Sequence, residues 1–308
     1  MVKNQKYMQF ANFNITFGQN QEPMLEHFVD ILYPAFSSDY RRVSADKETC
    51  FYFSDVKVKE IDEDIVLVGN IIKDTQYNVY TTLEDGKLIS NPSTVPTAPY
   101  SRFIIKLSNH RMVLVGNEPK SPDIRSFQAL VKSLLDNYRR IPEKEELGIP
   151  YALVNIVDIP LNDDVKIILS QAKKIKSVRL RFFPLNNDIN PVPMAEAVNN
   201  EMRSIGSNHA NIQFTSPGNP DSVLKLLQQS AGLAATTVVI QDQQGKVTTI
   251  KDKQFASKKE IDIPQNVDSH DDSYILSQAK QDEPFTRQSE DNTAVFNKLK
   301  GVLKSLIS

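Results

Sequence analysis

The chain has 308 residues, about twice the length of a common single domain, so its length predicts two domains. Hydrophobic residues make up 40% of the chain, which is enough to bury a core. The 36 lysines and arginines against 38 aspartates and glutamates leave a net charge of −2. The total charge therefore does not indicate a nucleic acid, a membrane or an acidic substrate as the partner.

The single cysteine, Cys50, excludes an internal disulfide framework and a multi-cysteine zinc or iron–sulfur site. It is typical of a reducing compartment. The first residues contain no apolar run typical of a signal peptide, and no stretch reaches the roughly 18 apolar residues of a membrane span. We therefore expect a cytoplasmic protein without membrane insertion. Because neither a P-loop nor a dinucleotide-binding glycine pattern occurs, we expect no cofactor.

The first half predicts mainly β-strands. Apolar and polar side chains alternate, as expected when one face of a sheet is buried, and this strand series covers residues 9–17, 49–59, 65–72 and 76–82. Residues 22–36 place apolar side chains at helical spacing, with Pro34 expected to distort the last turn. The sequence Glu84-Asp85-Gly86-Lys87 predicts a hairpin turn, because Asp-Gly readily adopts positive φ angles.

Residues 91–99 contain three prolines and predict an extended connector instead of a regular element. Two apolar strands follow, over residues 102–107 and 111–116, and then a helix from Ser121 to about Arg139. Residues 140–150 are rich in charge and bounded by prolines, which is typical of a domain boundary. The sequence therefore predicts a β-rich N-terminal domain over residues 1–140 and a second domain over residues 150–308.

In the second half, strands alternate with short helices, which favours a sheet layered with helices. The predicted segments cover residues 151–157, 163–172, 176–183, 193–205, 211–215, 221–233, 236–241 and 246–251. Residues 295–307 predict an amphipathic closing helix that packs on its own domain or forms a dimer surface. The fold class is α+β: a mostly antiparallel N-terminal sheet with packed helices, then an α/β-layered C-terminal domain with a closing helix.

The second half carries a local charge asymmetry that the total conceals. Nine acids but only two bases fall within residues 260–291; without that segment, residues 150–308 hold 16 bases and 9 acids. The bases gather in two clusters, which we interpret as candidate nucleic-acid-binding residues. They are Lys173, Lys174, Lys176, Arg179 and Arg181 in the first cluster, and Lys251, Lys253, Lys258 and Lys259 in the second.

Strand geometry supports part of this interpretation. On a β-strand, Arg179 and Arg181 project from one face, and the intervening apolar residues project from the other into the core. The two guanidinium groups then stand about 6 to 7 Å apart, close to the spacing of successive phosphates on one nucleic-acid strand. Such a face holds a backbone without reading bases. The alternative is that both clusters are ordinary solvated faces that protect edge strands.

The acidic segment over residues 260–291 also has two interpretations. Its net charge of −7 could mask the basic surface until DNA displaces it, or could meet the basic face of a second subunit. In the other interpretation it is a mobile surface loop.

No catalytic signature is present. A magnesium-dependent nuclease needs carboxylates gathered around the metal, and Asp55, Asp62 and Asp64 come nearest to that pattern. The alternative is that these are solvent-facing charges of a strand and its turn. The four histidines show no i, i+4 pair, which gives no support to a histidine-based metal site. We expect no catalytic residues and no metal ligands, with the nuclease as the alternative.

The order of the elements resembles a known group of proteins. The strands YSRFIIKL and RMVLVG lead into a helix containing Phe127, and the later TTVVIQDQQGKV is followed by a lysine-rich hairpin and the closing helix. This order resembles RexA-like phage-exclusion DNA-binding proteins and the Kiwa B subunit of bacterial antiphage defence.

The resemblance implies a homodimer that binds double-stranded DNA largely without sequence preference, with dimer arms that close around the duplex. Within this chain, the resemblance assigns DNA-binding residues only to the two basic clusters. We therefore expect the protein to bind duplex DNA through its phosphates without sequence preference and to act in phage exclusion. Whether a downstream defence protein is a further partner stays open. The alternatives are a magnesium-dependent nuclease and a regulatory module that recognises another protein with its N-terminal sheet edge.

Overall fold

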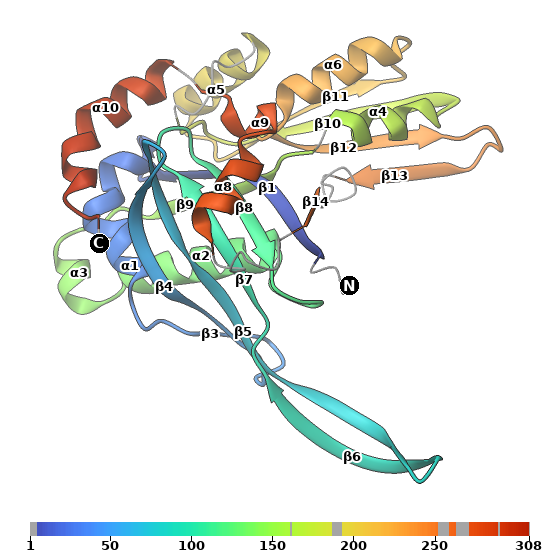
Figure 1. Ribbon diagram of the computed structural model, residues 1–308. Coiled ribbons are helices and arrows are strands. Elements are labelled where there is room, and N and C mark those ends of the chain that lie inside the picture. Colours follow the sequence, from blue (N-terminus) through green and yellow to red (C-terminus); the bar gives the residue numbers. More distant parts are fainter. Residues whose placement is uncertain are drawn as a thin grey trace.

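The computed structural model describes residues 5–160, 162–186, 193–251, 259–262, 271–288 and 290–307. The protein is α+β, with two antiparallel sheets that each carry helices (Figure 1). Within the described ranges, the first sheet has ten strands and the second has four. We call each sheet with its helices the first body and the second body. Every helix in these ranges is too short or too polar to cross a lipid bilayer.

The first sheet has the strand order β14-β1-β8-β7-β5-β4-β3, and β2 and β9 also pair with β1 while β6 pairs with β5. Its strands are β1 (Gln5–Phe17), β2 (Glu22–Pro23), β3 (Arg42–Val43), β4 (Cys50–Ile61), β5 (Asp64–Glu84), β6 (Lys87–Thr97), β7 (Tyr100–Lys106), β8 (Arg111–Gly116), β9 (Ala152–Asp158) and β14 (Lys259–Asp262). The alternation predicted for the first half therefore builds one curved antiparallel sheet.

Helices cover both faces of the first sheet. One face packs against η1 (Met24–His27), η2 (Phe28–Leu32), α1 (Tyr33–Phe36), α2 (Ile124–Arg139) and α10 (Glu290–Lys304). The other face packs against α8 (Asp272–Ala279) and α9 (Glu283–Thr286), and α3 (Pro142–Glu146) follows α2. Because successive side chains of a strand alternate, β1 contributes Phe13 and Ile15 to one core and Met8 and Phe10 to the other.

Local sequence explains the two helical segments of the first half. The predicted helix before Arg139 is confirmed: the Asp123 side chain accepts a hydrogen bond from the Ser126 amide at 2.9 Å and caps α2. Residues 22–36 are helical only in part, as successive 3₁₀, π and α turns. Pro34 has no amide hydrogen for the carbonyl of Asp30, so a continuous α-helix does not form there.

Strands β5 and β6 extend beyond the first sheet as a two-stranded ribbon (Figure 1). The predicted turn is confirmed, with φ of 48° at Asp85 and 77° at Gly86. The predicted connector over residues 91–99 is wrong, because most of it belongs to β6. Prolines are tolerated here since β6 is an exposed edge strand, and Pro92 lies opposite a register shift in the pairing.

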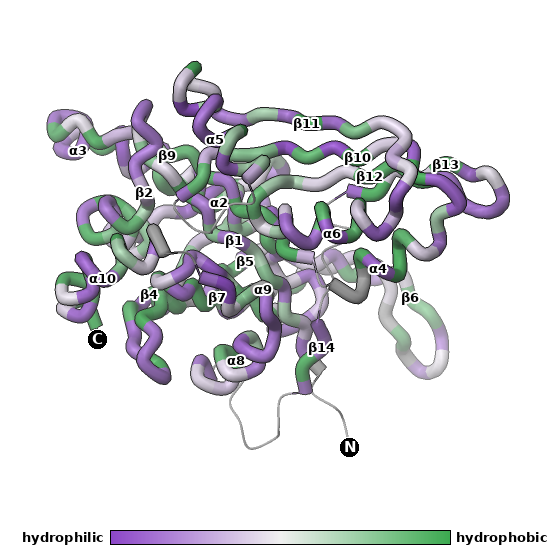
Figure 2. Tube along the Cα trace, turned by 90° about the horizontal axis from the view of Figure 1, so that it is seen from above, coloured by the Kyte–Doolittle hydropathy of each residue, from purple (hydrophilic) through white to green (hydrophobic). Residues whose placement is uncertain are grey.

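The second body is a four-stranded sheet in the order β11-β10-β12-β13, whose strands run side by side in Figure 2. Its elements are α4 (Asn162–Ser170), β10 (Lys174–Phe182), α5 (Pro193–Ile205), β11 (Ala210–Thr215), α6 (Pro220–Ser230), β12 (Ala234–Gln241) and β13 (Val247–Lys251). The three helices cover one face, where Val178, Leu180 and Phe182 are buried as predicted. We call the other face the open face.

The sheets divide the chain differently from the predicted domains over residues 1–140 and 150–308. Strand β9 comes after the predicted boundary, yet it pairs with β1 in the first sheet. Strand β14 also joins β1, and the closing helix α10 buries Phe296 and Leu303 in the core of the first body. The prediction that this helix packs on the C-terminal domain is therefore wrong, because its apolar stripe does not specify which core it covers.

The acidic segment is partly structured on the first body. Asp272, at the start of α8, is buried and accepts hydrogen bonds from Arg102 Nε and Nη2 at 2.7 and 2.8 Å and from Lys59 Nζ at 2.7 Å. Burial raises the pKa of Asp272, but the bonds from Arg102 and Lys59 outweigh it and hold the pKa below its usual value. This acid is therefore neutralised by structural partners, while residues 263–270 lie outside the described ranges.

Buried side-chain amides join the two bodies. On β1, Asn12 Nδ2 donates to the Gly232 carbonyl at 2.9 Å, and Asn14 Nδ2 donates to the Pro184 carbonyl at 2.8 Å. The Met24 amide donates to Asn186 Oδ1 at 2.7 Å. Because buried hydrogen bonds are costly to break, these contacts hold the open face against the first body.

Candidate nucleic-acid interface

The open face carries the two arginines that the sequence predicts to share a face. Strand pairing places Arg179 beside Gln213 of β11 and Thr237 of β12, and places Thr237 beside Lys251 of β13. Residues opposite each other in neighbouring strands project from the same face, so these four side chains form a row across the sheet. Arg181 lies two residues further along β10 and projects to the same side. The predicted shared face is confirmed.

Both arginines are exposed and have neutral partners. Arg179 Nε and Nη2 donate to Gln213 Oε1 at 3.3 and 3.1 Å. The Arg181 guanidinium lies over the Phe183 ring, 5.4 Å from its centroid. Neither has a carboxylate within ion-pair distance in the part of the chain that the structure describes. Their positive charge is therefore not neutralised by these partners.

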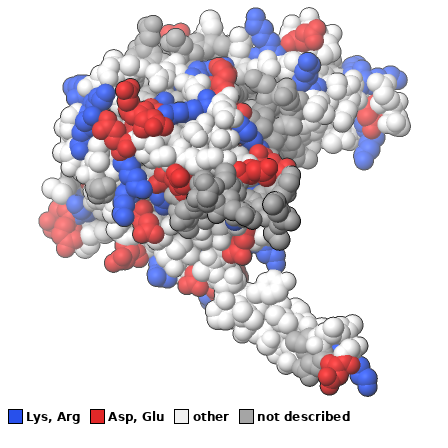
Figure 3. Space-filling view, in the orientation of Figure 1, with Lys and Arg blue, Asp and Glu red and all other residues white. Residues whose placement is uncertain are grey.

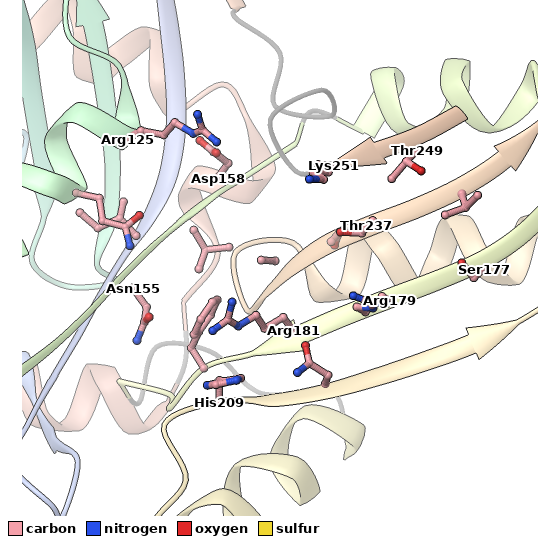
Figure 4. Close-up of a pocket in the computed structure, with 18 residues that line it drawn as sticks. Arg125, Asn155, Asp158, Ser177, Arg179, Arg181, His209, Thr237, Thr249 and Lys251 are labelled. Atoms are coloured by element: carbon pink, nitrogen blue, oxygen red, sulfur yellow. The ribbon is translucent and has the colours of Figure 1, made fainter. Parts of the chain in front are cut away.

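A cavity of about 960 Å³ lies between the open face and the first body. One wall consists of β10, β12 and β13, with contributions from β11, and the other consists of α2 and β9. Figure 4 shows Arg179 and Lys251 on the sheet wall, and it shows Arg125 and Asp158 pointing toward each other across from them. We call this cavity the cleft.

The described lining of the cleft is predominantly cationic. It includes four arginines and lysines against one carboxylate, that of Asp158; the cations are Arg125, Arg179, Arg181 and Lys251. Threonine hydroxyls from β12 and β13 lie between the cations on the sheet wall. Because a partly enclosed site is less polarisable than water, these charges attract an anion more strongly than they would on a flat surface. The cleft is therefore suited to a phosphate-bearing ligand.

The structure distributes the remaining residues of the first cluster along the start of β10. Lys174 is exposed and pairs with Gln241, so it shares the open face with Arg179. Lys176 is half-buried at the register shift of β10, and Lys173 is exposed just before the strand. Only Lys174 thus extends the cationic row.

The second cluster is not gathered at one place. Lys251 ends β13 and lines the cleft. Lys259 lies in β14 of the first sheet, where its Nζ is 2.7 Å from Asp282 Oδ2. This placement corrects the interpretation of Lys259 as part of the same basic surface, because an ion pair holds it on the other body. Lys253 and Lys258 lie outside the described residues.

Sequence reasoning missed the wall that the first body contributes. Arg125 is exposed in the first turn of α2, where a helical pattern indicates only a solvated side chain. His209 precedes β11 and has no sequence signal of its own. Thr237 and Thr249 alternate with buried residues along β12 and β13, which is the one pattern that could have indicated a polar open face.

The carboxylates weighed for a nuclease do not form a metal site within the described residues. Asp64 Oδ1 is 2.9 Å from Lys106 Nζ, and its Oδ2 is 2.9 Å from Lys280 Nζ. Asp55 accepts a hydrogen bond from Asn70 Nδ2 at 3.3 Å, and Asp62 is largely exposed. The same ranges contain no group of three histidine, cysteine, aspartate or glutamate side chains arranged to hold a metal.

The fold and the cleft define a class of protein: an α+β protein whose open antiparallel sheet forms one wall of a cationic cleft. Residues 6–280 match the family described as a domain of unknown function, DUF4747, and the chain belongs to this family. No curated protein and no solved structure matches the chain. The family description names no activity, so the function is argued from the cleft.

Proposed function

We propose that the protein binds double-stranded DNA without regard to sequence, through backbone phosphates held at the cationic cleft. The observation that carries the proposal is the row of Arg179, Thr237 and Lys251 across the open face, with Arg181 beside it. Two exposed arginines with neutral partners leave positive charge that no carboxylate among the described residues neutralises by an ion pair.

The chemistry of the row favours phosphates over base edges. A guanidinium group donates two parallel hydrogen bonds to a phosphate, and a threonine hydroxyl adds a single donor. Neighbouring strands are about 4.8 Å apart, so Arg179 and Lys251 stand about 10 Å apart, while Arg179 and Arg181 stand about 7 Å apart on one strand. This spread allows contacts with several phosphates, and phosphate contacts carry no sequence information.

The biological setting is proposed from the resemblance to RexA-like and Kiwa B subunit-like proteins. That resemblance supports a cytoplasmic DNA-binding component of antiphage defence that acts in phage exclusion, with a downstream defence partner protein left open. The cleft supports the proposed DNA binding and is not an argument for the role in antiphage defence. The described carboxylates give the nuclease alternative no support, because Asp64 forms ion pairs with Lys106 and Lys280.

Fluorescence anisotropy with two labelled duplexes of equal length and unrelated sequence tests the proposal. The wild-type protein is expected to bind both with equal affinity, and R179E/R181E is expected to lose binding to both. The matched control is K166E, because Lys166 belongs to the same stretch of sequence but is exposed on α4, on the helix-covered side of the sheet. Absence of binding by the wild-type protein at 50 mM salt would refute the proposal.

A second candidate function, a protein–protein module, is favoured by the β5–β6 ribbon. Its strand register places Tyr77 opposite Val95, and Leu83 opposite Leu88. Leu83 and Leu88 are 69% and 78% exposed, and the ribbon is almost uncharged except at its tip (Figure 3). An isolated two-stranded ribbon is marginally stable in water, and an exposed apolar strip marks interaction surfaces. We propose that the ribbon is the arm through which two copies form a homodimer.

The double substitution L83S/L88S tests the role of the ribbon. The wild-type protein is expected to sediment as a dimer and the variant as a folded monomer. The residues contact solvent in one chain, so their loss removes no core packing. A monomeric wild-type protein, or a dimer that the substitutions leave intact, would contradict this function.

A further inference from the structure

The cleft has too little space for a complete duplex. Its volume of about 960 Å³ lies at the upper end of the roughly 300–1,000 Å³ that is common for sites holding small organic ligands. A duplex has two strands around its grooves, and the major groove alone is about 12 Å wide. A paired duplex can therefore bring only the phosphates along one of its edges to the cationic row, whereas an unpaired strand is small enough to enter the cleft.

One end of the cleft combines an aromatic ring with a guanidinium plane. Phe182 and Ala210 pair at the ends of β10 and β11, so the next residues outward, Phe183 and His209, are neighbours, and both line the cleft. The Arg181 guanidinium lies over the Phe183 ring, 5.4 Å from its centroid. Figure 4 shows Arg181 and His209 at this same end. The cleft therefore offers flat π surfaces next to its cationic row.

Flat π surfaces can stack on unpaired bases but not on bases inside a duplex. Bases inside a duplex stack on each other, whereas an unpaired base exposes a face that stacks on an aromatic ring or an arginine plane. The opposite wall presents the Asn155 amide, which can donate to and accept from a base edge in any sequence. Phosphate contacts along the cationic row and base stacking at its end are thus both available to one unpaired strand.

We propose that the cleft binds a short unpaired DNA strand, with its phosphates on Arg179 and Lys251 and a base stacked at Arg181 and Phe183. This inference rests on the proposed function and names the part of the DNA that enters the cleft. A duplex is then bound best where it offers a single-stranded end or an unpaired segment, because a paired region brings only backbone phosphates to the cationic row and no base to Arg181 and Phe183.

Anisotropy titrations with four labelled DNAs test this inference: a single strand, the blunt duplex, and the duplex with a 5′ or a 3′ overhang. The wild-type protein is expected to bind the single strand and at least one overhang duplex at least about tenfold more tightly than the blunt duplex. The variant F183L is expected to bind the single strand and that overhang duplex roughly 5- to 150-fold more weakly than the wild-type protein does. This is the range for loss of one stacked base. Its blunt-duplex affinity is expected to stay unchanged.

Two further variants keep the result interpretable. F214L is the matched control, because Phe214 pairs with Val178 and therefore projects from the helix-covered face of the same sheet. It is expected to bind every DNA as the wild-type protein does. If F183L folds poorly, R181K keeps the charge and removes the guanidinium plane. It is expected to lower the ratio of single-strand affinity to blunt-duplex affinity, because the lysine still attracts phosphates but offers no plane for a base to stack on.

The outcomes separate this inference from the proposed function. Equal affinity for single-stranded and blunt DNA, or an F183L variant that binds all four DNAs like the wild-type protein, overturns the inference and leaves duplex binding in place. No binding to any DNA at 50 mM salt overturns both. Competition by a free mononucleotide at the same concentration as the single strand also overturns the inference, because it indicates a nucleotide site and not a strand site.

Discussion

The salt dependence of DNA affinity is a quantitative consequence of the cationic open face. Four cations share that face: Lys174, Arg179, Arg181 and Lys251. If each contacts one phosphate of duplex DNA, the logarithm of affinity should fall with the logarithm of salt concentration at a slope of about −3.6. Raising salt from 50 to 200 mM should then weaken binding by about 150-fold.

Removing two of these cations should halve the slope. The variant R179A/R181A leaves two contacts, so the expected slope is about −1.8 and the same salt increase should weaken its binding by only about 12-fold. Both arginines are exposed and pair only with neutral groups, so the free energy of unfolding should change by less than about 1 kcal/mol. Thermal melts of the variant check that it is folded.

The assay is anisotropy of one labelled duplex at five salt concentrations, for the wild-type protein, R179A/R181A and K166A. K166A removes a cation from the helix-covered side and should keep the wild-type slope. A slope that R179A/R181A leaves unchanged would refute the placement of phosphates on the open face. An equal fall in slope for K166A would show that general charge, and not this face, controls binding.

Two further predictions concern stability. D272N should destabilise the fold by about 3–5 kcal/mol in urea denaturation at pH 7, because it breaks a buried ion pair with Arg102. The pKa of Asp272 is lower in the native state than in the unfolded state. Ionised Asp272 therefore stabilises the fold fully above the unfolded pKa of about 3.9, and this stabilisation is lost as pH falls through the native pKa. D272N should accordingly reduce the dependence of the free energy of unfolding on pH at acidic pH. G232A should unfold at a lower temperature than G86A: both glycines have φ of 77°, but a Cβ at Gly232 would lie 2.5 Å from Arg111 Nη1, while one at Gly86 meets nothing within 4 Å.

Each stability prediction has its own contrary result. Equal melting temperatures for G232A and G86A would mean that the Arg111 contact adds nothing to backbone strain, which both variants share. A D272N variant with the wild-type acid profile would mean that Asp272 does not titrate as part of the Arg102 pair.

Local sequence determined the features that depend on near neighbours. Alternation in β10 placed Arg179 and Arg181 on one face, an aspartate cap preceded α2, and Asp85-Gly86 made the predicted turn. These features follow from the geometry of a few consecutive residues. They were predictable because a strand has a period of two and a helix a period of 3.6.

Tertiary structure alone decided which elements meet. Periodicity identifies an apolar face but does not identify the surface that covers it, so the sequence could not show that α10 and β14 return to the first body. For the same reason it grouped Lys259 with Lys251, although an ion pair to Asp282 holds Lys259 on the other sheet. The wall containing Arg125 exists only because buried amides between distant segments hold α2 opposite the open face.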